Sequence, residues 1–361
     1  MEPHGSANPP EGGEQREGWT LRGSLSKEQA QKLAEFRERI LGDTGRDGLQ
    51  NDWTEAQRRW VDDMCLCRFL RAREWDLNKA EDMLRGTLKW RESFGVERIT
   101  FEEIEVEAAT GKLYVHGKDK YGRPTIYMKP GRDNTTDPGP KVKYLVWVLE
   151  QAILQMDASK GVEKMLWICD FANTGVSNFK LSNVNVSNEV LRILMNHYPE
   201  RLALCFLINT PWMFNAFWRC IKPFLNEVTL SKVRFVGAKQ FSQICDVVGA
   251  ESLEKPYGGE NEEDYDHERW KEMLFQQLEQ QKAEEKAAEK EGEEEGTEKK
   301  EQKKEGDSTS QANEGDTDTD DSISCTSSSA CDEDGDGEEK KEKKRSKSTA
   351  RSKRNRKKTN S

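Results

Sequence analysis

The 361-residue sequence predicts an α/β fold: an N-terminal region of three helices, an α/β domain, and a C-terminal tail without fixed structure. Apolar residues first recur at helical spacing, up to Phe94. From Leu113 to Val248, short apolar runs then alternate with amphipathic segments. After about Glu279 apolar residues nearly vanish. Alternating strands and helices are typical of parallel strand pairs, and a chain so poor in apolar residues cannot offset its ordering entropy.

Charged residues make up 34% of the sequence and are concentrated toward the C-terminus. This uneven distribution divides the chain into five expected segments. We expect a disordered N-terminus over residues 1–26 and a helical region over 27–95. The α/β domain is expected over 96–260 and a further helix around Trp270 over 261–285. Residues 286–361 are expected to form a disordered tail, first acidic and then basic.

The three N-terminal helices are read from caps and periodicity. Ser26 is the expected N-cap of a helix over Lys27–Leu41. A second helix is expected to open at Thr54 and run through Leu70, and a third to follow Asp76 as far as Phe94.

The α/β domain is expected to begin with a hairpin and to continue with strands and helices in turn. The expected strands are Leu113–His116, Pro124–Lys129, Met165–Phe171, Leu202–Asn209 and Lys232–Val236. The expected helices are Lys143–Met156, Ser187–Tyr198, Trp212–Leu225 with a break at Pro223, and Lys239–Val248.

Several classes of function are disfavoured by what the sequence lacks. No run approaches the roughly 20 apolar residues of a membrane span, and the N-terminus does not resemble a signal peptide. The eight cysteines have no framework spacing, which suits free thiols in a reducing compartment. The four histidines lie far apart, and Cys65 and Cys67 lack partners for a zinc site. We therefore predict a cytoplasmic protein that is not an enzyme and has no metal or cofactor.

The segment Pro211–Leu225 is unusual because aromatic side chains occupy more than one face of a short helix. One interpretation is a helix enclosed on several sides by a larger core. The other is a gate helix whose inner face covers an apolar cavity and whose outer face meets the membrane interface. The aromatic residues of this expected gate are Trp212, Phe214, Phe217, Trp218 and Phe224.

Several motifs in sequence order resemble the CRAL-TRIO lipid-binding domain. They are Tyr198-Pro199-Glu200-Arg201, Lys222-Pro223-Phe224-Leu225, Val228-Thr229-Leu230-Ser231-Lys232, Arg68-Phe69-Leu70-Arg71-Ala72-Arg73 and Lys89-Trp90-Arg91. The residues from Asp119 to Pro124 are similar to the first hairpin of that domain. The resemblance covers about Thr54 to Gly259 and is greatest to the yeast-type phosphatidylinositol transfer proteins.

This resemblance implies a mixed sheet that floors a lipid cavity, helices around it and a mobile gate at Pro211–Leu225. It also implies an inositol-phospholipid headgroup site formed by Arg73, Asp119, Arg201, Thr229 and Lys232. Cations suit phosphate, a hydroxyl can donate to it, and a carboxylate can accept from inositol hydroxyls. Taken singly, Arg73 or Asp119 would more often belong to a surface ion pair, but the occurrence of all these residues at matching positions favours the headgroup site.

Two nearby residues bear on the same site. Glu200 is expected to pair with Lys232 or Arg201 and so to compensate buried charge when the pocket is empty. Glu74 follows Arg73 where the family usually has a lysine, which removes one cation.

A second departure concerns the residues that bind choline phospholipid in the family, namely two Tyr, a Ser and a Thr. The corresponding positions here are Val115, Ile126, Met165 and Trp167. Without hydroxyls, they disfavour a choline headgroup. The alternative is a one-residue shift in the alignment, which would exchange the two faces of a strand.

These observations predict a protein that binds phosphatidylinositol and transfers or presents it between intracellular membranes, exchanging it with an unidentified, non-choline second lipid. Transient membrane contact and presentation to lipid kinases are implied by the resemblance. The alternative is a non-transferring adaptor that senses lipid and recruits partners through its tail.

The basic end of the tail, Lys340–Lys358, leaves three interpretations open: a solvated tail, an electrostatic membrane anchor, or a nuclear-localisation or nucleic-acid patch. The absence of interleaved aromatic residues disfavours specific nucleic-acid binding. Peripheral membrane localisation is expected, with nuclear localisation left open. The acidic stretch before it, rich in Ser and Thr, is a candidate for phosphorylation.

Overall fold

The computed structural model describes residues 21–42, 53–175, 181–276 and 279, and all structural statements below concern these residues. The expected disordered tail and most of the expected disordered N-terminus lie outside them.

The described N-terminal region contains four α-helices: α1 (Lys27–Leu41), α2 (Glu55–Trp60), α3 (Asp63–Ala72) and α4 (Leu77–Phe94). Ser26 caps α1 through a capping box with Gln29, as expected. The single helix expected from Thr54 to Leu70 is instead α2 and α3. The cause is Asp62, whose carboxylate accepts the backbone N–H of Cys65 at 2.6 Å and starts a new helix.

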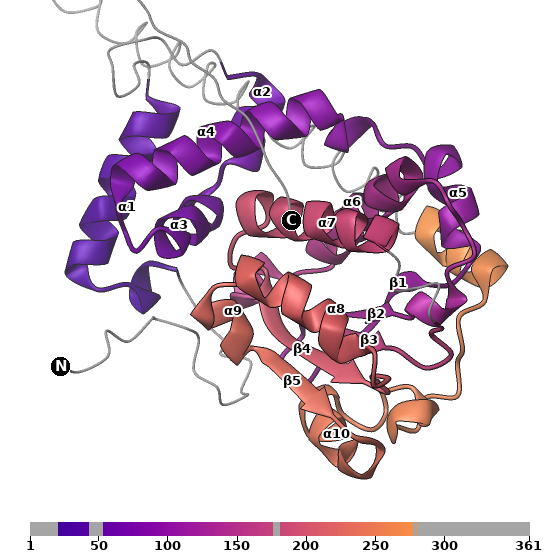
Figure 1. Ribbon diagram of the computed structural model, residues 1–361. Helices are drawn as coiled ribbons and strands as arrows, with labels where there is room; N and C mark the ends of the chain where they lie inside the picture. The colour runs from indigo at the N-terminus through magenta and orange to yellow at the C-terminus, as the bar shows by residue number, and fades with distance from the viewer. Residues whose placement is uncertain (1–20, 43–52, 176–180, 277–278, 280–361) are drawn as a thin grey trace, which may run out of the picture. The chain divides into compact units, whose positions relative to one another are not determined.

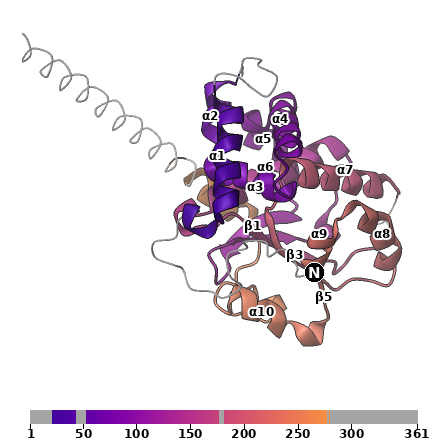
Figure 2. The same ribbon diagram turned by 90° about the vertical axis from the view of Figure 1, so that its left-hand side faces the viewer.

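The N-terminal helices share their own apolar core. Figure 2 shows α1 running alongside α3 and α4. Their facing side chains are fully or almost fully buried and include Leu33, Phe36, Ile40, Cys65, Leu66, Phe69, Leu70, Leu84 and Leu88. The periodicity read from the sequence therefore marked the buried face of these helices.

A fifth helix, α5 (Phe101–Ala108), was not expected from the sequence. Thr100 and Glu103 form its capping box, and Phe101, Ile104 and Ala108 are buried. Its three exposed or partly exposed glutamates leave only a narrow apolar stripe, which makes the helical period hard to read.

The sheet has five strands in sequence order: β1 (Leu113–Lys118), β2 (Pro124–Met128), β3 (Met165–Asp170), β4 (Leu202–Ile208) and β5 (Val233–Val236). β1 pairs with β2 antiparallel, and the remaining pairs are parallel. The mixed sheet surrounded by helices confirms the predicted fold class.

The connections place helices on both faces of this sheet (Figure 1). The parallel strands follow each other in one direction, so right-handed crossovers bring all their helices to the same face. These helices are α6 (Pro138–Leu154), α7 (Leu181–His197), α8 (Phe214–Ile221) and α9 (Glu227–Ser231). The opposite face is covered by α10 (Ser242–Val248) and the segment after it.

Short 3-10 helices join several of these elements. They are η1 (Arg22–Ser24), η2 (Val96–Arg98), η3 (Pro130–Arg132), η4 (Ala158–Lys160), η6 (Lys222–Phe224), η7 (Ala238–Gln240) and η8 (Lys255–Tyr257). A last helical stretch covers residues 267–276 and packs Trp270 against Trp147 of α6, with ring centroids 5.6 Å apart.

The register of the strands decides which side chains share a face. Val115 pairs with Ile126, Ile126 with Trp167, Trp167 with Cys205, and Cys205 with Val233. This row runs across the whole sheet and belongs to the core beneath α6, α7 and α8. Tyr114, Tyr127, Leu166, Ile168 and Phe206 occupy the other face.

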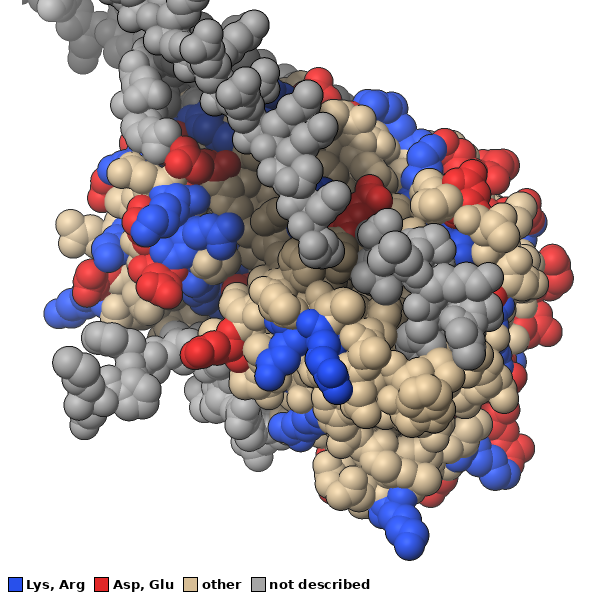
Figure 3. Space-filling model, in the orientation of Figure 1, with Lys and Arg blue, Asp and Glu red and all other residues tan. Residues whose placement is uncertain are grey.

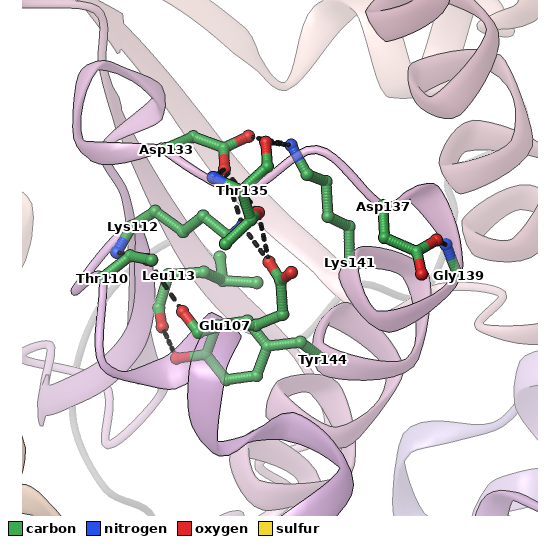
Figure 4. Close-up of polar contacts among 10 residues, drawn as sticks. All are labelled: Glu107, Thr110, Lys112, Leu113, Asp133, Thr135, Asp137, Gly139, Lys141 and Tyr144. Atoms are coloured by element: carbon green, nitrogen blue, oxygen red, sulfur yellow. Dashed lines mark hydrogen bonds and ion pairs between the residues drawn. The ribbon is translucent and has the colours of Figure 1, made fainter.

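A buried polar network fixes the start of β1 against α5 and α6 (Figure 4). The ammonium of Lys112 contacts the carboxylate of Glu107 and lies 2.8 Å from Asp133 Oδ1. Lys141 donates to Asp133 Oδ2 at 2.6 Å, and the hydroxyl oxygen of Thr135 lies 2.9 Å from both Glu107 Oε2 and Asp133 Oδ1, so it can donate to either carboxylate. Because every charge has an opposite partner, the network can be buried without an uncompensated ion.

Hydrogen bonds close the carboxyl ends of the central strands. Asp170, at the end of β3, accepts from the side chains of Asn209 at 2.8 Å and Tyr257 at 2.9 Å. A Cβ at Gly131 would lie 2.3 Å from the carbonyl oxygen of Ala172, so only glycine permits this approach. These contacts give Asp170 a structural role at the end of β3.

Candidate functional site

Charged residues stand directly before three parallel strands. Glu163 and Lys164 precede β3, Glu200 and Arg201 precede β4, and Lys232 precedes β5. The backbone N–H of Met165 donates to the carbonyl of Arg201 at 2.8 Å, which aligns the first two pairs. Parallel strands bring these side chains to the same end of the sheet.

Glu200 lies between two lysines. Its Oε2 is 3.7 Å from the ammonium of Lys232 and 3.9 Å from that of Lys164. The backbone of Glu200 has φ of 58°, a left-handed conformation that is costly for a residue with a Cβ. Of the two partners expected for Glu200, the structure shows Lys232, and it adds Lys164.

Arg201 is bound through carbonyl and sulfur rather than through a carboxylate. Its Nη1 donates to the backbone carbonyl of Glu163 at 2.8 Å and lies 3.4 Å from Met156 Sδ. Burial, and then the nearby Arg68, lower the pKa of Arg201 to about 9. The guanidinium remains protonated at neutral pH, but its charge is only partly compensated.

Helix α3 contributes two further arginines from the N-terminal region. Arg71 lies 2.5 Å from Glu163 Oε1, and Arg68 lies 4.0 Å from Glu163 Oε2. We name the amino-end cluster as these residues together with the charged residues that precede the strands: Arg68, Arg71, Glu163, Lys164, Glu200, Arg201 and Lys232. Its five cations face two carboxylates, so the cluster carries an excess of positive charge.

The other predicted headgroup residues stand close to this cluster along the chain. Arg73 is the C-cap residue of α3, two residues beyond Arg71, and its Nη1 donates to the carbonyl of Ala72 at 2.9 Å. Thr229 lies in α9, and its carbonyl accepts the backbone N–H of Lys232 at 3.1 Å.

Asp119 is buried in the hairpin between β1 and β2, where it stabilises the turn. Its carboxylate accepts from the backbone N–H groups of Tyr121 and Arg123, both at 2.9 Å, and from Arg123 Nε at 2.6 Å. These bonds account for the position of Asp119 without a ligand. A role toward inositol hydroxyls stays a prediction.

The inner face of α8 packs into the core. Phe214 is 2% exposed, and its ring lies 4.6 Å from that of Phe171 at the end of β3, between centroids. Phe217 and Trp218 are half-buried against the same core. In Figure 1, α8 lies between α7 and β5.

The outer face of the same segment is open to solvent. Trp212 is 81% exposed and Phe224 is 48% exposed. Val228 in α9 and Phe235 in β5 extend this surface, at 56% and 50% exposure. Figure 3 shows the surface over α8 as mostly uncharged, with a few basic residues. The segment thus has a buried face and an exposed face that carries aromatic side chains.

The four positions assigned to the second-ligand cavity lie on one face of the sheet. Val115, Ile126, Met165 and Trp167 all belong to the core beneath α6–α8. Val115 also lines a small cavity of about 90 Å³ with Trp147 and Leu274. A larger depression of about 410 Å³ lies elsewhere, between Phe94 and the start of α6.

Within the described ranges, no group of three or more His, Cys, Asp or Glu side chains is arranged to hold a metal ion. No helix among those same residues is both long and apolar enough to cross a bilayer.

Sequence reasoning found Arg201, Glu200 and Lys232 but missed Arg68, Arg71, Glu163 and Lys164. The available signal was the repeated acid–base pair before two successive strands, Glu163-Lys164 and Glu200-Arg201. Parallel pairing alone would have brought those pairs together.

Comparison with known proteins adds family matches over most of the described chain. A family model described as the CRAL/TRIO domain matches residues 108–259, and one described as the CRAL/TRIO N-terminal domain matches residues 25–86.

Three relatives illustrate the similarity. A CRAL-TRIO domain-containing protein of Schizosaccharomyces pombe, C23B6.04c, is 35% identical over 226 residues, which is 62% of this chain and 22% of that protein. The phosphatidylinositol transfer protein PDR17 of Saccharomyces cerevisiae is 35% identical over 204 residues, covering 54% of this chain and 57% of PDR17. The SEC14 cytosolic factor of Kluyveromyces lactis is 32% identical over 256 residues, covering 66% and 81%.

Among solved structures, the crystal structure of Sfh5 shares the fold with a TM-score of 0.53 at 17% identity, covering 71% of this chain and 98% of Sfh5.

Proposed function

The chain belongs to the CRAL-TRIO family of lipid-binding proteins, and we propose that it binds phosphatidylinositol and transfers or presents it at intracellular membranes. The observation that carries this proposal is the amino-end cluster, in which five cations converge on two carboxylates. A relative named as a phosphatidylinositol transfer protein supports the same choice of lipid.

The cluster suits a phosphate group. Arg201 is held in place by two acceptors that carry no full negative charge, so its positive charge attracts an anion. Hydrogen bonds between charged partners are about twice as strong as neutral ones. Thr229 and Lys232 stand one helical turn apart at the same end of the sheet, where a hydroxyl and an ammonium could share the phosphate oxygens.

The gate segment suits contact with a bilayer surface. Trp212 and Phe224 present aromatic rings to solvent, and Arg219 and Lys222 between them are exposed. Aromatic and basic side chains together favour the interface of a membrane with anionic lipid. We propose that α8 opens there and lets lipid reach the apolar face of the sheet.

The second lipid is proposed to lack a choline headgroup. The row that contains Val115, Ile126 and Trp167 offers apolar surface and no hydroxyl to a headgroup. A zwitterionic group placed there would lose its hydrogen bonds to water without replacement.

A vesicle-exchange assay tests the proposal. Lys232→Ala is expected to lower phosphatidylinositol transfer about tenfold, the effect of losing one charge-assisted hydrogen bond. Lys255→Ala is the matched control, because Lys255 is an exposed lysine paired with Glu262 far from the cluster. Normal phosphatidylinositol transfer by Lys232→Ala would show that the headgroup site is misplaced.

Two further readouts sharpen the result. Mass spectrometry of lipids that co-purify with the intact protein is expected to detect phosphatidylinositol and a second, non-choline lipid. A protein that binds inositol lipid but does not move it between vesicles would favour the adaptor alternative, and presentation to lipid kinases would then be tested by their product formation.

A further inference from the structure

Lys164 is a buried lysine in the amino-end cluster that no motif identified. Lys164 is 8% exposed, and its Nζ lies 3.9 Å from Glu200 Oε2. Because Met165 and Leu202 are register partners, Lys164 and Arg201 stand side by side before neighbouring strands. Lys232 approaches the same carboxylate from the start of β5, at 3.7 Å.

We propose that Lys164 is a phosphate-binding residue of the headgroup site, acting together with Lys232 while Glu200 holds both ammonium groups in position when the site is empty. This inference rests on the proposed function and names a further specificity-determining residue for it. The ligand group is the phosphate of an inositol phospholipid.

Charge balance supports this role. The two ammonium groups share the carboxylate of Glu200, and the amino-end cluster around them holds five cations and two carboxylates. Keeping several cations together out of water is costly, and an arriving phosphate adds negative charge that lowers this cost. The binding free energy of an anion between these two lysines should therefore be more favourable than that of an anion at an exposed lysine.

Lys164 also explains how the site can tolerate Glu74. The resemblance to the transfer proteins places a lysine after Arg73, where this chain has an acid. Lys164 supplies a cation from the position directly before β3, rather than from the chain that follows α3. The site thus keeps its positive charge by a different residue.

The pH dependence of binding provides a signature for Lys164. The charged groups that act on it are Lys232, Glu200, Glu163 and Arg71. Burial first, and then Lys232, lower the pKa of Lys164 to about 8, with the two carboxylates opposing this. The empty site loses the Lys164 proton as the pH rises through that value, so inositol-lipid affinity should fall between pH 7 and pH 9.

The test measures phosphatidylinositol uptake from vesicles by the full chain, with phosphatidylinositol diluted in an uncharged-lipid matrix. Lys164→Gln is expected to lower uptake at pH 7 about tenfold and to flatten the pH profile. Lys164→Arg keeps a charge at position 164 that does not titrate in this range. Its uptake is therefore expected to fall less between pH 7 and pH 9 than that of the wild type, and the fall that remains is assigned to Arg201. Lys160→Gln, an exposed lysine four residues upstream, is the control.

Three outcomes separate the possibilities. If Lys164→Gln takes up phosphatidylinositol as well as the wild type, or if Lys164→Arg shows the same fall at high pH, the inference is wrong. If Lys232→Ala loses uptake while Lys164→Gln does not, the headgroup site stands and only Lys164 is excluded. If neither variant changes uptake, the proposed site itself fails. Thermal unfolding of Lys164→Arg checks that the fold is retained.

Discussion

The indole of Trp218 meets the ring of Phe235 edge-on, with centroids 5.4 Å apart and planes at 86°. This contact joins α8 to β5, and it would hold the proposed gate segment against the sheet. Phe214 touches the same ring, at 6.0 Å between centroids. Phe235 is half-exposed, so it can be shortened without opening the main core.

Phe235→Ala should release α8 from β5. Loss of one aromatic pair costs about 0.5–1.5 kcal/mol beyond burial, which should increase hydrogen exchange in α8 and speed lipid exchange between vesicles. Phe275→Ala is the control, because the ring of Phe275 packs against that of Phe101 in α5, with centroids 5.4 Å apart. Unchanged exchange rates in α8 would show that this contact does not hold the gate.

The two faces of the gate segment should respond differently to substitution. Trp212→Ser should reduce binding to anionic liposomes and leave the free energy of unfolding within about 0.5 kcal/mol, as for other exposed sites. Phe214→Ala should cost about 3–5 kcal/mol, because it opens a cavity in the core. Liposome sedimentation measures membrane binding, and urea unfolding measures the free energy of unfolding, for both variants. Equal liposome binding by wild type and Trp212→Ser would exclude the outer face as the membrane contact.

The network of Figure 4 gives a stability prediction with an internal control. Lys112→Met leaves the carboxylate of Glu107 buried without its ammonium partner and should cost about 3–5 kcal/mol in urea unfolding. Lys143→Met removes a partly exposed pair with Glu103 at 2.5 Å and should cost less than about 1 kcal/mol. Similar costs for both variants would contradict the assigned difference in burial.

His116 should make stability depend on pH. Its Nδ1 lies 3.6 Å from Glu254 and its Nε2 lies 3.4 Å from Glu263. The hydrogen bond to Glu254 is the largest cause that raises the pKa of His116 above its ordinary value of 6.5, while burial opposes it. A folded-state pKa above the unfolded value adds stability that is complete below about pH 6.5 and is lost as the pH rises through the folded-state pKa.

The stability difference between wild type and His116→Gln should therefore be larger at pH 5.5 than at pH 9. Urea unfolding at both pH values measures it. A difference that grows toward pH 9 would mean that His116 is not held as a cation.

The sequence predicted the strands closely because each is a short apolar run bounded by polar residues. The observed β2 (Pro124–Met128), β3 (Met165–Asp170) and β4 (Leu202–Ile208) differ from the expected ranges by one residue at the C-terminal end. The helices were less well predicted. The break between α2 and α3 depends on one cap at Asp62, and a cap inside an apolar pattern is easily read as an exposed helical residue.

The residues of the amino-end cluster could be predicted only where a motif named them. Arg201 and Lys232 lie in such motifs, whereas Lys164 and Arg71 are separated along the chain from the residues that they approach. Their meeting depends on the order of the strands and on how α3 packs against the sheet. Neither the strand order nor the packing of α3 can be predicted from the local periodicity of the sequence.

The two edge strands of the sheet affect the risk of aggregation if the proposed gate segment opens at a membrane. β5 has four residues, and β1 has a register shift between Val115 and Lys118, where Gly117 adopts φ of 66°. Short or bulged outer strands are poor templates for adding another chain. If α8 opens as proposed and uncovers the apolar face, the sheet would still offer a second copy little backbone with which to pair, which would protect the open form against aggregation.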